Sequence, residues 1–191
     1  MLLPSVSCEL NGLSNLSIFS LVMSHILLTS FQTWLPHQKS NSSDDLLEEV
    51  AKLDGLPHSL TFLRHLPVDI SQASELAIAT INELQPDIII CCGMAESRHH
   101  LSVESNARNE DKVLNTLVDL DKLLQGLVKT TLSHDAGNFV CEGLYYSVLN
   151  HLQKNEIKKH GIFVHVPVLT QNNLADILTD FTLIMHKLTA L

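Results

Sequence analysis

Two hydrophobic patterns alternate along the chain from Ser24 onward. Short, nearly continuous apolar runs are typical of buried strands, whereas apolar residues that recur every three or four positions are typical of amphipathic helices. The first pattern predicts strands over residues 25–29, 60–66, 87–92, 128–133 and 161–166. The second predicts helices over residues 44–53, 71–84, 112–127, 139–153 and 174–188.

Polar residues mark where two of these helices begin. Ser43 and Asp44 are expected to cap the first helix, and Ser71 the second. The predicted inner face of the second helix consists of Ala73, Leu76, Ala77, Thr80, Ile81 and Leu84. The helix predicted over residues 112–127 depends on the apolar stripe of Val113, Leu117, Leu120 and Leu124.

Strands that alternate with helices of this length predict an α/β fold with right-handed crossovers. We expect a three-layer α/β/α sandwich around a mainly parallel, twisted sheet, similar to the phosphorylase/hydrolase type. The run DIIICC over residues 87–92 is apolar throughout, as in a central strand covered on both faces. In such sheets, functional residues gather at the carboxyl ends of the strands.

The length of 191 residues and the 45% of hydrophobic residues favour one globular domain, predicted over residues 23–191. Residues 1–22 are predicted to be an N-terminal extension, either a disordered tail or the result of an alternative start. Their apolar patches have no basic residues before them and are too short to span a membrane, so neither a signal peptide nor an anchor is expected.

The net charge of −9 argues against a nucleic-acid partner, because the longest basic run is Lys158–Lys159. A cytoplasmic protein with no membrane partner is expected. The adjacent Cys91 and Cys92 should point to opposite faces of a strand and form no disulfide. The chain has no CxxC pair, and the neighbouring His99 and His100 diverge, so neither a metal nor a cofactor is predicted.

Cys141 and His165 are the strongest candidates for chemistry. Cys141 falls in the first turn of a predicted helix, where the helix dipole favours a thiolate, so a thiol activated before any base acts is expected. His165 follows 24 residues later, near the end of a predicted strand. A lone buried cysteine or strand histidine is more often a packing residue. Glu104 follows the strand 87–92, and taken alone it would be interpreted as a charged residue in a solvated loop.

Five segments in one order resemble the pyroglutamyl peptidase I (pyrrolidone carboxyl peptidase) family of cysteine peptidases. The family has TGFEPFGG with an NPS helix start, a PD-apolar strand before GQAGGR, an ER segment, AGTFVCN and GFIHVP. This chain has LLTSFQTW with NSS, PDIIICCGMAESR, VESNARN, AGNFVC and GIFVHVP. The resemblance runs from about Ser24 to the carboxyl terminus.

The resemblance implies an exopeptidase that releases N-terminal pyroglutamate from peptides, with Cys141 as nucleophile, His165 as base and Glu104 as orienting carboxylate. The substrate-binding residues that it implies are Phe31, Trp34, Met94, Arg98, Phe139 and Val140. The expected partner is a small peptide with an N-terminal pyroglutamate, and the oligomeric state is left open.

Several positions depart from the family pattern. Trp34 stands where the second aromatic residue of the first loop is expected, and Met94 replaces a glutamine. Glu96 and Ser97 replace paired glycines, and residues 109–133 lack an ARIPDNEG-like loop whose arginine acts on the substrate carbonyl. Two alternatives therefore remain: a hydrolase of the same fold with a different small amide substrate, or a non-catalytic homologue.

Overall fold

The computed structural model describes residues 23–191, so the extension predicted over residues 1–22 lies outside the described residues. The elements are β1 (His25–Phe31), α1 (Ser42–Ala51), β2 (Ser59–Leu66), α2 (Ile70–Leu84), β3 (Ile88–Met94), β4 (Leu101–Glu104), β5 (Asn106–Asn109), β6 (Lys112–Asn115), α3 (Leu120–Leu124), β7 (Thr130–Ser133), α4 (Val140–Lys154), β8 (His160–Val166) and α5 (Leu174–Leu188).

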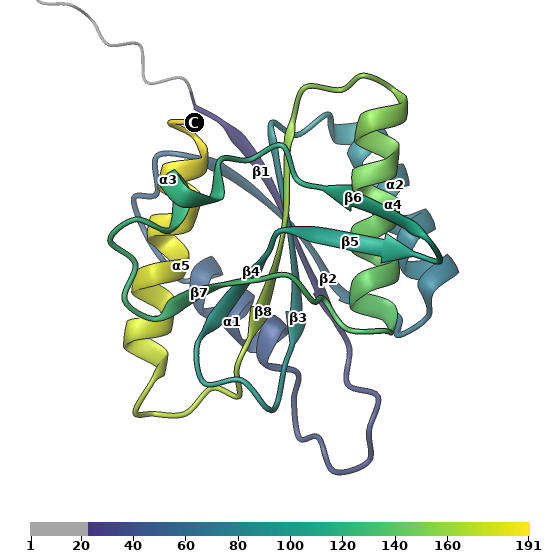
Figure 1. The fold of residues 1–191 in the computed structure, drawn as a ribbon. Helices are drawn as coiled ribbons and strands as arrows, with labels where there is room; N and C mark the ends of the chain where they lie inside the picture. Colours follow the sequence, from purple (N-terminus) through teal and green to yellow (C-terminus); the bar gives the residue numbers. More distant parts are fainter. Residues whose placement is uncertain (1–22) are drawn as a thin grey trace, which may run out of the picture.

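Six strands form a mixed, mostly parallel sheet in the order β2-β1-β3-β8-β4-β7. The first four are parallel to one another, β4 is antiparallel to β8, and β7 runs parallel to β4. Helices α1, α3 and α5 lie on one side of the sheet, and α2 and α4 lie on the other (Figure 1). The predicted α/β fold with a mainly parallel sheet is therefore confirmed.

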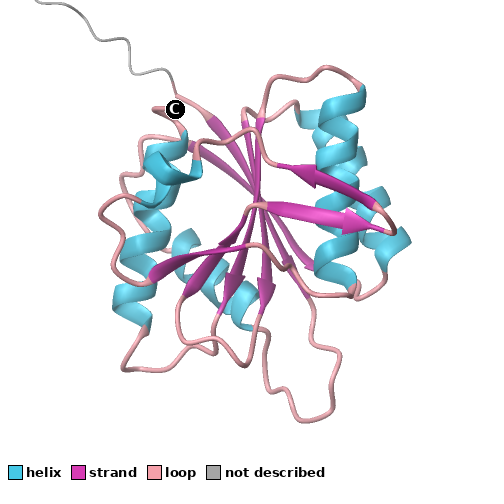
Figure 2. Cartoon of the chain, in the orientation of Figure 1, coloured by secondary structure: helices cyan, strands magenta, loops and turns pink. Residues whose placement is uncertain are grey.

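Each face of the sheet has its own hydrophobic core. Apolar residues of α1, α3 and α5 pack on one face together with Cys92, and those of α2 and α4 pack on the other with Cys91. The two adjacent cysteines thus point to opposite faces, as predicted, and both are free thiols. Figure 2 shows the resulting helix–sheet–helix layers and the small hairpin beside them.

The capping residues differ from those predicted. Helix α1 has Asn41 as its N-cap, and the Asn41 side chain accepts the N–H of Ser43 at 3.1 Å. Helix α2 has Asp69 as its N-cap, and its carboxylate accepts the N–H of Gln72 at 2.9 Å. Each helix begins earlier than expected because an Asn or Asp oxygen satisfies its first donors. Leu76 of α2 is also 47% exposed, so it does not belong to the inner face.

Residues 112–127 do not form the predicted helix. Lys112–Asn115 is a strand that pairs antiparallel with β5, and only Leu120–Leu124 is helical. The hairpin turn contains Glu110 with a φ of 53°, in the left-handed region that tight hairpin turns use. Val113 is 49% and Leu117 75% exposed, so only the second half of the apolar stripe, Leu120 and Leu124, packs against a core. Strand pairing and turn geometry here outweigh a helical spacing of apolar residues.

Strand β4 was not predicted, because its four residues are too few for a periodic signal and follow a polar segment. All four are buried between β8 and β7. The neighbouring edge strand is held by Asp180 of α5, whose carboxylate accepts the N–H of Lys129 at 2.6 Å and the hydroxyl of Thr130 at 2.8 Å. These bonds fix β7 beside β4 and so help to position Glu104.

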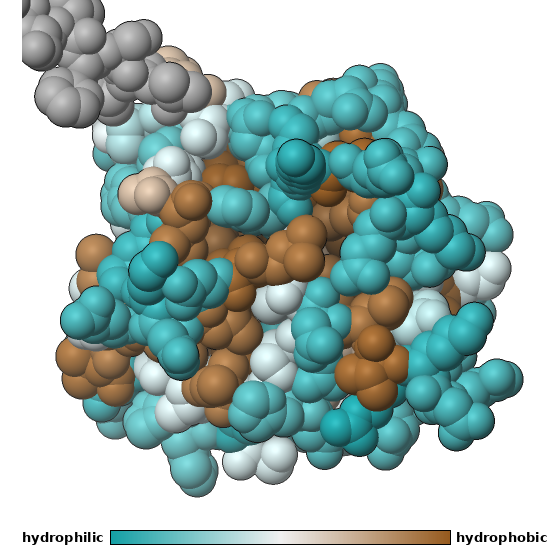
Figure 3. Space-filling view, turned by 45° about the horizontal axis from the view of Figure 1, so that its top comes forward, coloured by the Kyte–Doolittle hydropathy of each residue, from teal (hydrophilic) through white to brown (hydrophobic). Residues whose placement is uncertain are grey.

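The face drawn in Figure 3 is mainly hydrophilic, with apolar patches between the hydrophilic residues. The most exposed apolar residues of the described region include Leu117 and Val128, which flank α3 in the sequence. Within residues 23–191, no helix is both long enough and apolar enough to cross a bilayer.

Candidate active site

The candidate site lies at the edge of the sheet where the parallel strands end. Phe31 ends β1, Met94 ends β3 and Cys141 is the second residue of α4, and all three line one cavity. The loop between β1 and α1 extends beyond this edge (Figure 1). The topology therefore brings together residues from segments that are far apart in the sequence.

A buried hydrogen bond joins the predicted carboxylate and imidazole. Glu104 Oε1 lies 2.7 Å from His165 Nδ1, and the two side chains come from the antiparallel pair β4 and β8. Glu104 is fully buried and His165 is 5% exposed. Glu104 is therefore not the solvated loop charge that the sequence by itself suggested. Its main-chain carbonyl also accepts the hydroxyl of Tyr145 at 3.0 Å, which ties the end of β4 to α4.

Arg98 supports the same carboxylate. Its Nη1 donates to Glu104 Oε1 at 2.6 Å, and its Nη2 donates to the main-chain carbonyl of Asp135 at 2.8 Å. Burial raises the pKa of Glu104, but the hydrogen bonds from His165 and Arg98 and the positive charge of His165 outweigh it, so the pKa is lowered. Glu104 consequently stays ionised beside the imidazole at neutral pH.

Gly93 brings the Cys141 thiol close to the β3–β8 pair. Gly93 is the register partner of His165 in the sheet. A Cβ atom at Gly93 would lie 2.6 Å from Cys141 Sγ and 2.8 Å from the ring of Phe163. The Phe163 ring in turn lies 4.9 Å from the His165 ring, measured between centroids. Only a residue without a side chain allows the sulfur to approach the strands here.

The first turn of α4 presents backbone donors beside the thiol. Phe139 is the N-cap, and no side chain caps the helix. The N–H groups of Val140, Cys141 and Glu142 are early in the helix, where no preceding turn provides an acceptor. They are therefore available to an anion that forms next to Cys141.

The thiol itself is not activated in advance. Burial raises the pKa of Cys141 to about 12, and repulsion from Glu104 adds to the rise, although Arg98 and the Cys141 N–H oppose it. The prediction of a thiolate stabilised by the helix start alone is therefore wrong. The surrounding protein displaces the water that would stabilise the charge, and one helix turn does not compensate for that loss. A base must take the proton during the reaction.

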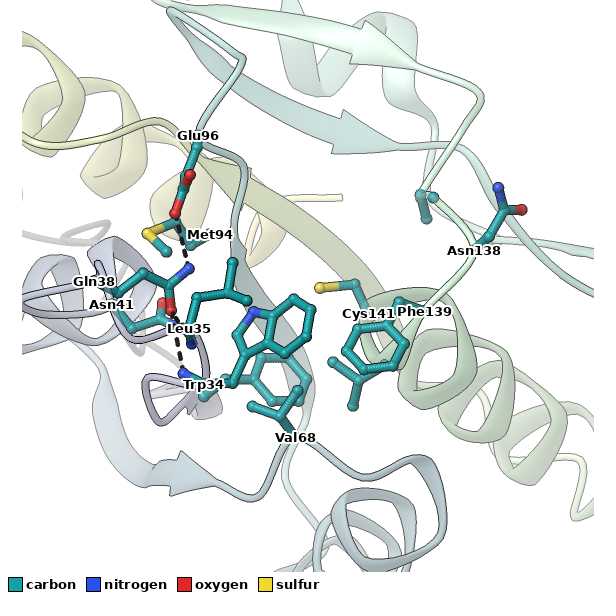
Figure 4. A pocket seen from close by; sticks show the side chains of 14 residues that line it. Trp34, Leu35, Gln38, Asn41, Val68, Met94, Glu96, Asn138, Phe139 and Cys141 are labelled. Carbon is teal, nitrogen blue, oxygen red and sulfur yellow. Dashed lines mark hydrogen bonds between the residues drawn. The ribbon is translucent and has the colours of Figure 1, made fainter.

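An apolar pocket of about 240 Å³ opens at the thiol. Its walls include Phe31, Trp34, Met94, Phe139, Val140 and Cys141. The rings of Trp34 and Phe139 are 5.0 Å apart between centroids and inclined by 38° (Figure 4). Five of the six residues that the sequence suggested for substrate binding thus share this pocket with Cys141. Arg98 is the exception, since it does not line the pocket and instead donates to Glu104.

Sequence reasoning missed the side chains that hold the first loop. Gln38 Nε2 donates to Glu96 at 2.8 Å, and Gln38 Oε1 accepts the N–H groups of Trp34 and Leu35 at 3.1 and 3.2 Å. The ring of His37 also lies 3.2 Å from Glu96. Nothing in the sequence marked Gln38, because its role depends on a partner 58 residues away.

Met94 has a structural contact as well as a place in the pocket wall. Its sulfur accepts the N–H of Ser42 at 3.4 Å, in the first turn of α1. The hydroxyl of Ser42 donates to the carbonyl of Val166, next to His165, at 3.0 Å. The start of α1 is thereby attached to the ends of both β3 and β8.

A thiol, an imidazole and a buried carboxylate at one edge of an α/β sheet are the groups that cysteine hydrolases use. A family model described as pyroglutamyl peptidase matches residues 24–122 and 118–187. The chain belongs to the pyroglutamyl peptidase family.

Individual relatives agree with this membership. A pyrrolidone-carboxylate peptidase of Brevibacillus brevis is 25% identical over 175 residues, which cover 78% of this chain and 80% of the relative. One from Brachyspira hyodysenteriae is 27% identical over 135 residues, covering 57% of this chain and 67% of the relative. The crystal structure of pyroglutamyl peptidase I from Bacillus amyloliquefaciens superposes with a TM-score of 0.77 at 19% identity, covering 88% of this chain and 96% of that one.

Proposed function

We propose that this protein is a cysteine exopeptidase that hydrolyses the bond after an N-terminal pyroglutamyl residue. Cys141 is the nucleophile, His165 the general base and acid, and Glu104 the residue that orients the imidazole. The observation that carries the proposal is the buried 2.7 Å contact between Glu104 and His165, whose register partner Gly93 lies directly against the Cys141 sulfur. Membership of the pyroglutamyl peptidase family supports the substrate class.

The reaction begins with proton transfer from the thiol to the imidazole. Because Nδ1 of His165 is bound to Glu104, Nε2 is the nitrogen that is free to take the proton from Cys141. Glu104 stabilises the resulting imidazolium, which compensates for the unfavourable ionisation of a thiol whose pKa is about 12. The thiolate and the imidazolium therefore form together, when substrate is bound.

The thiolate then attacks the carbonyl carbon of the pyroglutamyl residue, and the carbonyl electrons move onto oxygen. The N–H of Cys141, at the uncapped start of α4, donates to this oxyanion. When the tetrahedral intermediate collapses, the C–N bond breaks and the imidazolium gives its proton to the leaving amine. Water, deprotonated by His165, attacks the thioester, releases pyroglutamate and restores the thiol.

The pyroglutamyl ring is placed in the apolar pocket beside the thiol. A five-membered lactam is flat, and the rings of Trp34, Phe139 and Phe31 provide aromatic surfaces on which a planar amide can stack. The pocket volume of about 240 Å³ accommodates a ring of this size. A free α-amino group would be poorly solvated there, which favours the cyclised residue over glutamate or glutamine.

The decisive experiment is release of a fluorophore from a pyroglutamyl amide by the purified protein under reducing conditions. Wild type should turn over this substrate, and Cys141→Ala and His165→Ala should lose at least about a thousandfold in kcat/KM. Exposed His99, replaced by alanine, is the matched control and should retain activity. Turnover that persists in Cys141→Ala would contradict the proposal.

Met94 is the reason to assay a second substrate class, small amides other than pyroglutamyl amides, in parallel. A thioether replaces a family amide in the pocket wall, and its sulfur is already engaged with Ser42. The pocket therefore offers one fewer amide hydrogen bond to the lactam. If a proline amide, which lacks the lactam carbonyl, is cleaved faster than the pyroglutamyl amide, a changed small amide substrate is the better assignment.

A further inference from the structure

A second cavity lies next to the apolar pocket on the α4 side. It has a volume of about 380 Å³ and shares two wall residues, Asn138 and Phe139, with the first pocket. Figure 4 shows Asn138 beyond Phe139 as seen from Trp34. The remaining walls come from the β5–β6 hairpin, the start of α2, the segment between β7 and α4, and the first two turns of α4.

The lining of this cavity differs from that of the first. Three carboxylates line it, those of Glu110, Asp135 and Glu142, together with one guanidinium, that of Arg108. Arg108 is exposed, and within residues 23–191 its side chain makes no hydrogen bond or ion pair. A positively charged group entering the cavity therefore meets an excess of negative charge, and a carboxylate would be repelled.

Glu142 is the buried member of this set. It is 8% exposed, and its Oε1 accepts the main-chain N–H of Arg108 at 2.6 Å. Among the described residues, its other oxygen, Oε2, accepts no hydrogen bond, and the residue lines the cavity. Burial raises the pKa of Glu142, and the charges of Asp135 and Glu104 contribute to the rise. Because Glu142 lines the cavity and one of its oxygens has no protein donor, a donor group of a ligand in the cavity can bind to it.

The position of Glu142 connects the cavity to the reaction. It directly follows Cys141 in α4, and Phe139 separates the two cavities at the N-cap of the same helix. A peptide whose pyroglutamyl ring fills the apolar pocket has its scissile carbonyl at Cys141. The part of the peptide after the scissile bond must then extend away from the thiol. The second cavity is adjacent on that side, because it shares Asn138 and Phe139 with the apolar pocket.

We propose that this second cavity binds the side chain that follows pyroglutamate and selects a basic residue, lysine or arginine, over an acidic one. The selection rests on the proposed function, because it concerns the leaving half of the same peptide. A lysine ammonium or arginine guanidinium donates to Glu142 Oε2 and lies near Asp135, whereas Arg108 limits how strongly a cation is held. The preference appears in kcat/KM, since the interaction forms before the peptide bond breaks.

The test compares three peptides that differ only in the residue after pyroglutamate: lysine, alanine or glutamate. Wild type should cleave the lysine peptide about tenfold faster than the glutamate peptide, as kcat/KM at low salt. Glu142→Gln should reduce this lysine-to-glutamate ratio by about threefold or more, and Arg108→Gln should raise it by a similar factor. Glu83→Gln, on the exposed face of α2, is the matched control and should leave the ratio unchanged.

If part of the Glu142→Gln protein is unfolded, the rates for both peptides fall by the same factor, so their ratio within one preparation is unaffected. Arg108→Gln provides an independent reading, since the exposed side chain can be replaced while the backbone bond to Glu142 remains. A wild-type ratio near one, or a ratio that neither variant changes, would overturn the subsite while the peptidase activity stands. Failure to cleave the peptides and the fluorogenic pyroglutamyl amide alike would instead refute the proposed function, and the subsite with it.

Discussion

Gly93→Ala is the substitution for which the structure gives the most direct expectation. The added Cβ would lie 2.6 Å from Cys141 Sγ, whereas ordinary contacts begin near 3.4 Å, so the sulfur must move by about 0.8 Å. The ring of Phe163 at 2.8 Å blocks the other direction. Overpacking of this kind costs about 1–3 kcal/mol of stability. A displacement near 1 Å at the nucleophile should lower kcat by about a hundredfold.

Gly161→Ala separates the two effects. A Cβ at Gly161 meets Leu152 Cδ1 at 2.9 Å, a flexible side-chain end at the opposite end of β8 from His165. This control should lose a similar or smaller amount of stability but keep kcat within about threefold of wild type. Urea unfolding gives the stability, fluorogenic turnover gives kcat, and peptide mapping after iodoacetamide treatment gives the alkylation rate of Cys141. A Gly93→Ala protein that matches wild type in both kcat and Cys141 alkylation would refute the reasoning.

Three further outcomes follow from the described contacts. Glu104→Gln should lower kcat by on the order of 10³–10⁴, because it weakens the support of the His165 imidazolium, and near-normal turnover would contradict the orienting role. Burial and the neighbouring His186 lower the pKa of His58 in the folded protein. Below about pH 6.5 the unfolded chain therefore binds a proton at His58 more readily than the folded protein does, so the free energy of unfolding falls as the pH drops. Urea titrations at several pH values should show a smaller fall for His58→Gln, and an equal fall would be evidence against this linkage. Asp180→Ala should destabilise the protein by about 2–4 kcal/mol, because three donors at the start of β7 lose their acceptor. Thermal unfolding checks the last value, and a change below about 0.5 kcal/mol would contradict it.

The order of most elements could be predicted because their signals are local. Helix α5 has the predicted bounds, since its apolar residues repeat with a helical period from Leu174 to Leu188. The apolar run that contains Cys91 and Cys92 is a central strand, and its two faces reach different cores. In these segments, local spacing and tertiary packing favour the same structure.

The failures occur where a distant partner decides the structure. Strand β4 exists because β8 and β7 pair with its two edges, and four residues alone carry no such information. Lys112–Asn115 pairs with β5, although Val113 is the first residue of the apolar stripe that predicted a helix. The thiol of Cys141 likewise has a pKa set by burial among residues from other segments, not by its own helix turn.

The candidate site could be located from sequence only through the resemblance to a family. Cys141 and His165 each have a common packing explanation, and Glu104 appeared to be a surface charge. The contact of 2.7 Å between Glu104 and His165 depends on an antiparallel pairing that no periodicity indicated. Arg98 was expected at the substrate, but its guanidinium instead joins Glu104 to the carbonyl of Asp135. The order of motifs thus identified the residues, and the sheet topology explains their arrangement.

Two departures from the family pattern are linked in space. Glu96 stands where the family has a glycine, and Gln38 belongs to the first loop, which lacks the family's later glycines. The Glu96 carboxylate accepts Gln38 Nε2, while Gln38 Oε1 accepts the N–H of Trp34. Side-chain hydrogen bonds therefore attach the loop to the pocket at positions where the family pattern has glycines. The effect of either change on the pocket depends on the other, because together they keep the aromatic ring of Trp34 in the pocket wall beside Cys141. Stacking of a flat amide ring requires such an aromatic wall.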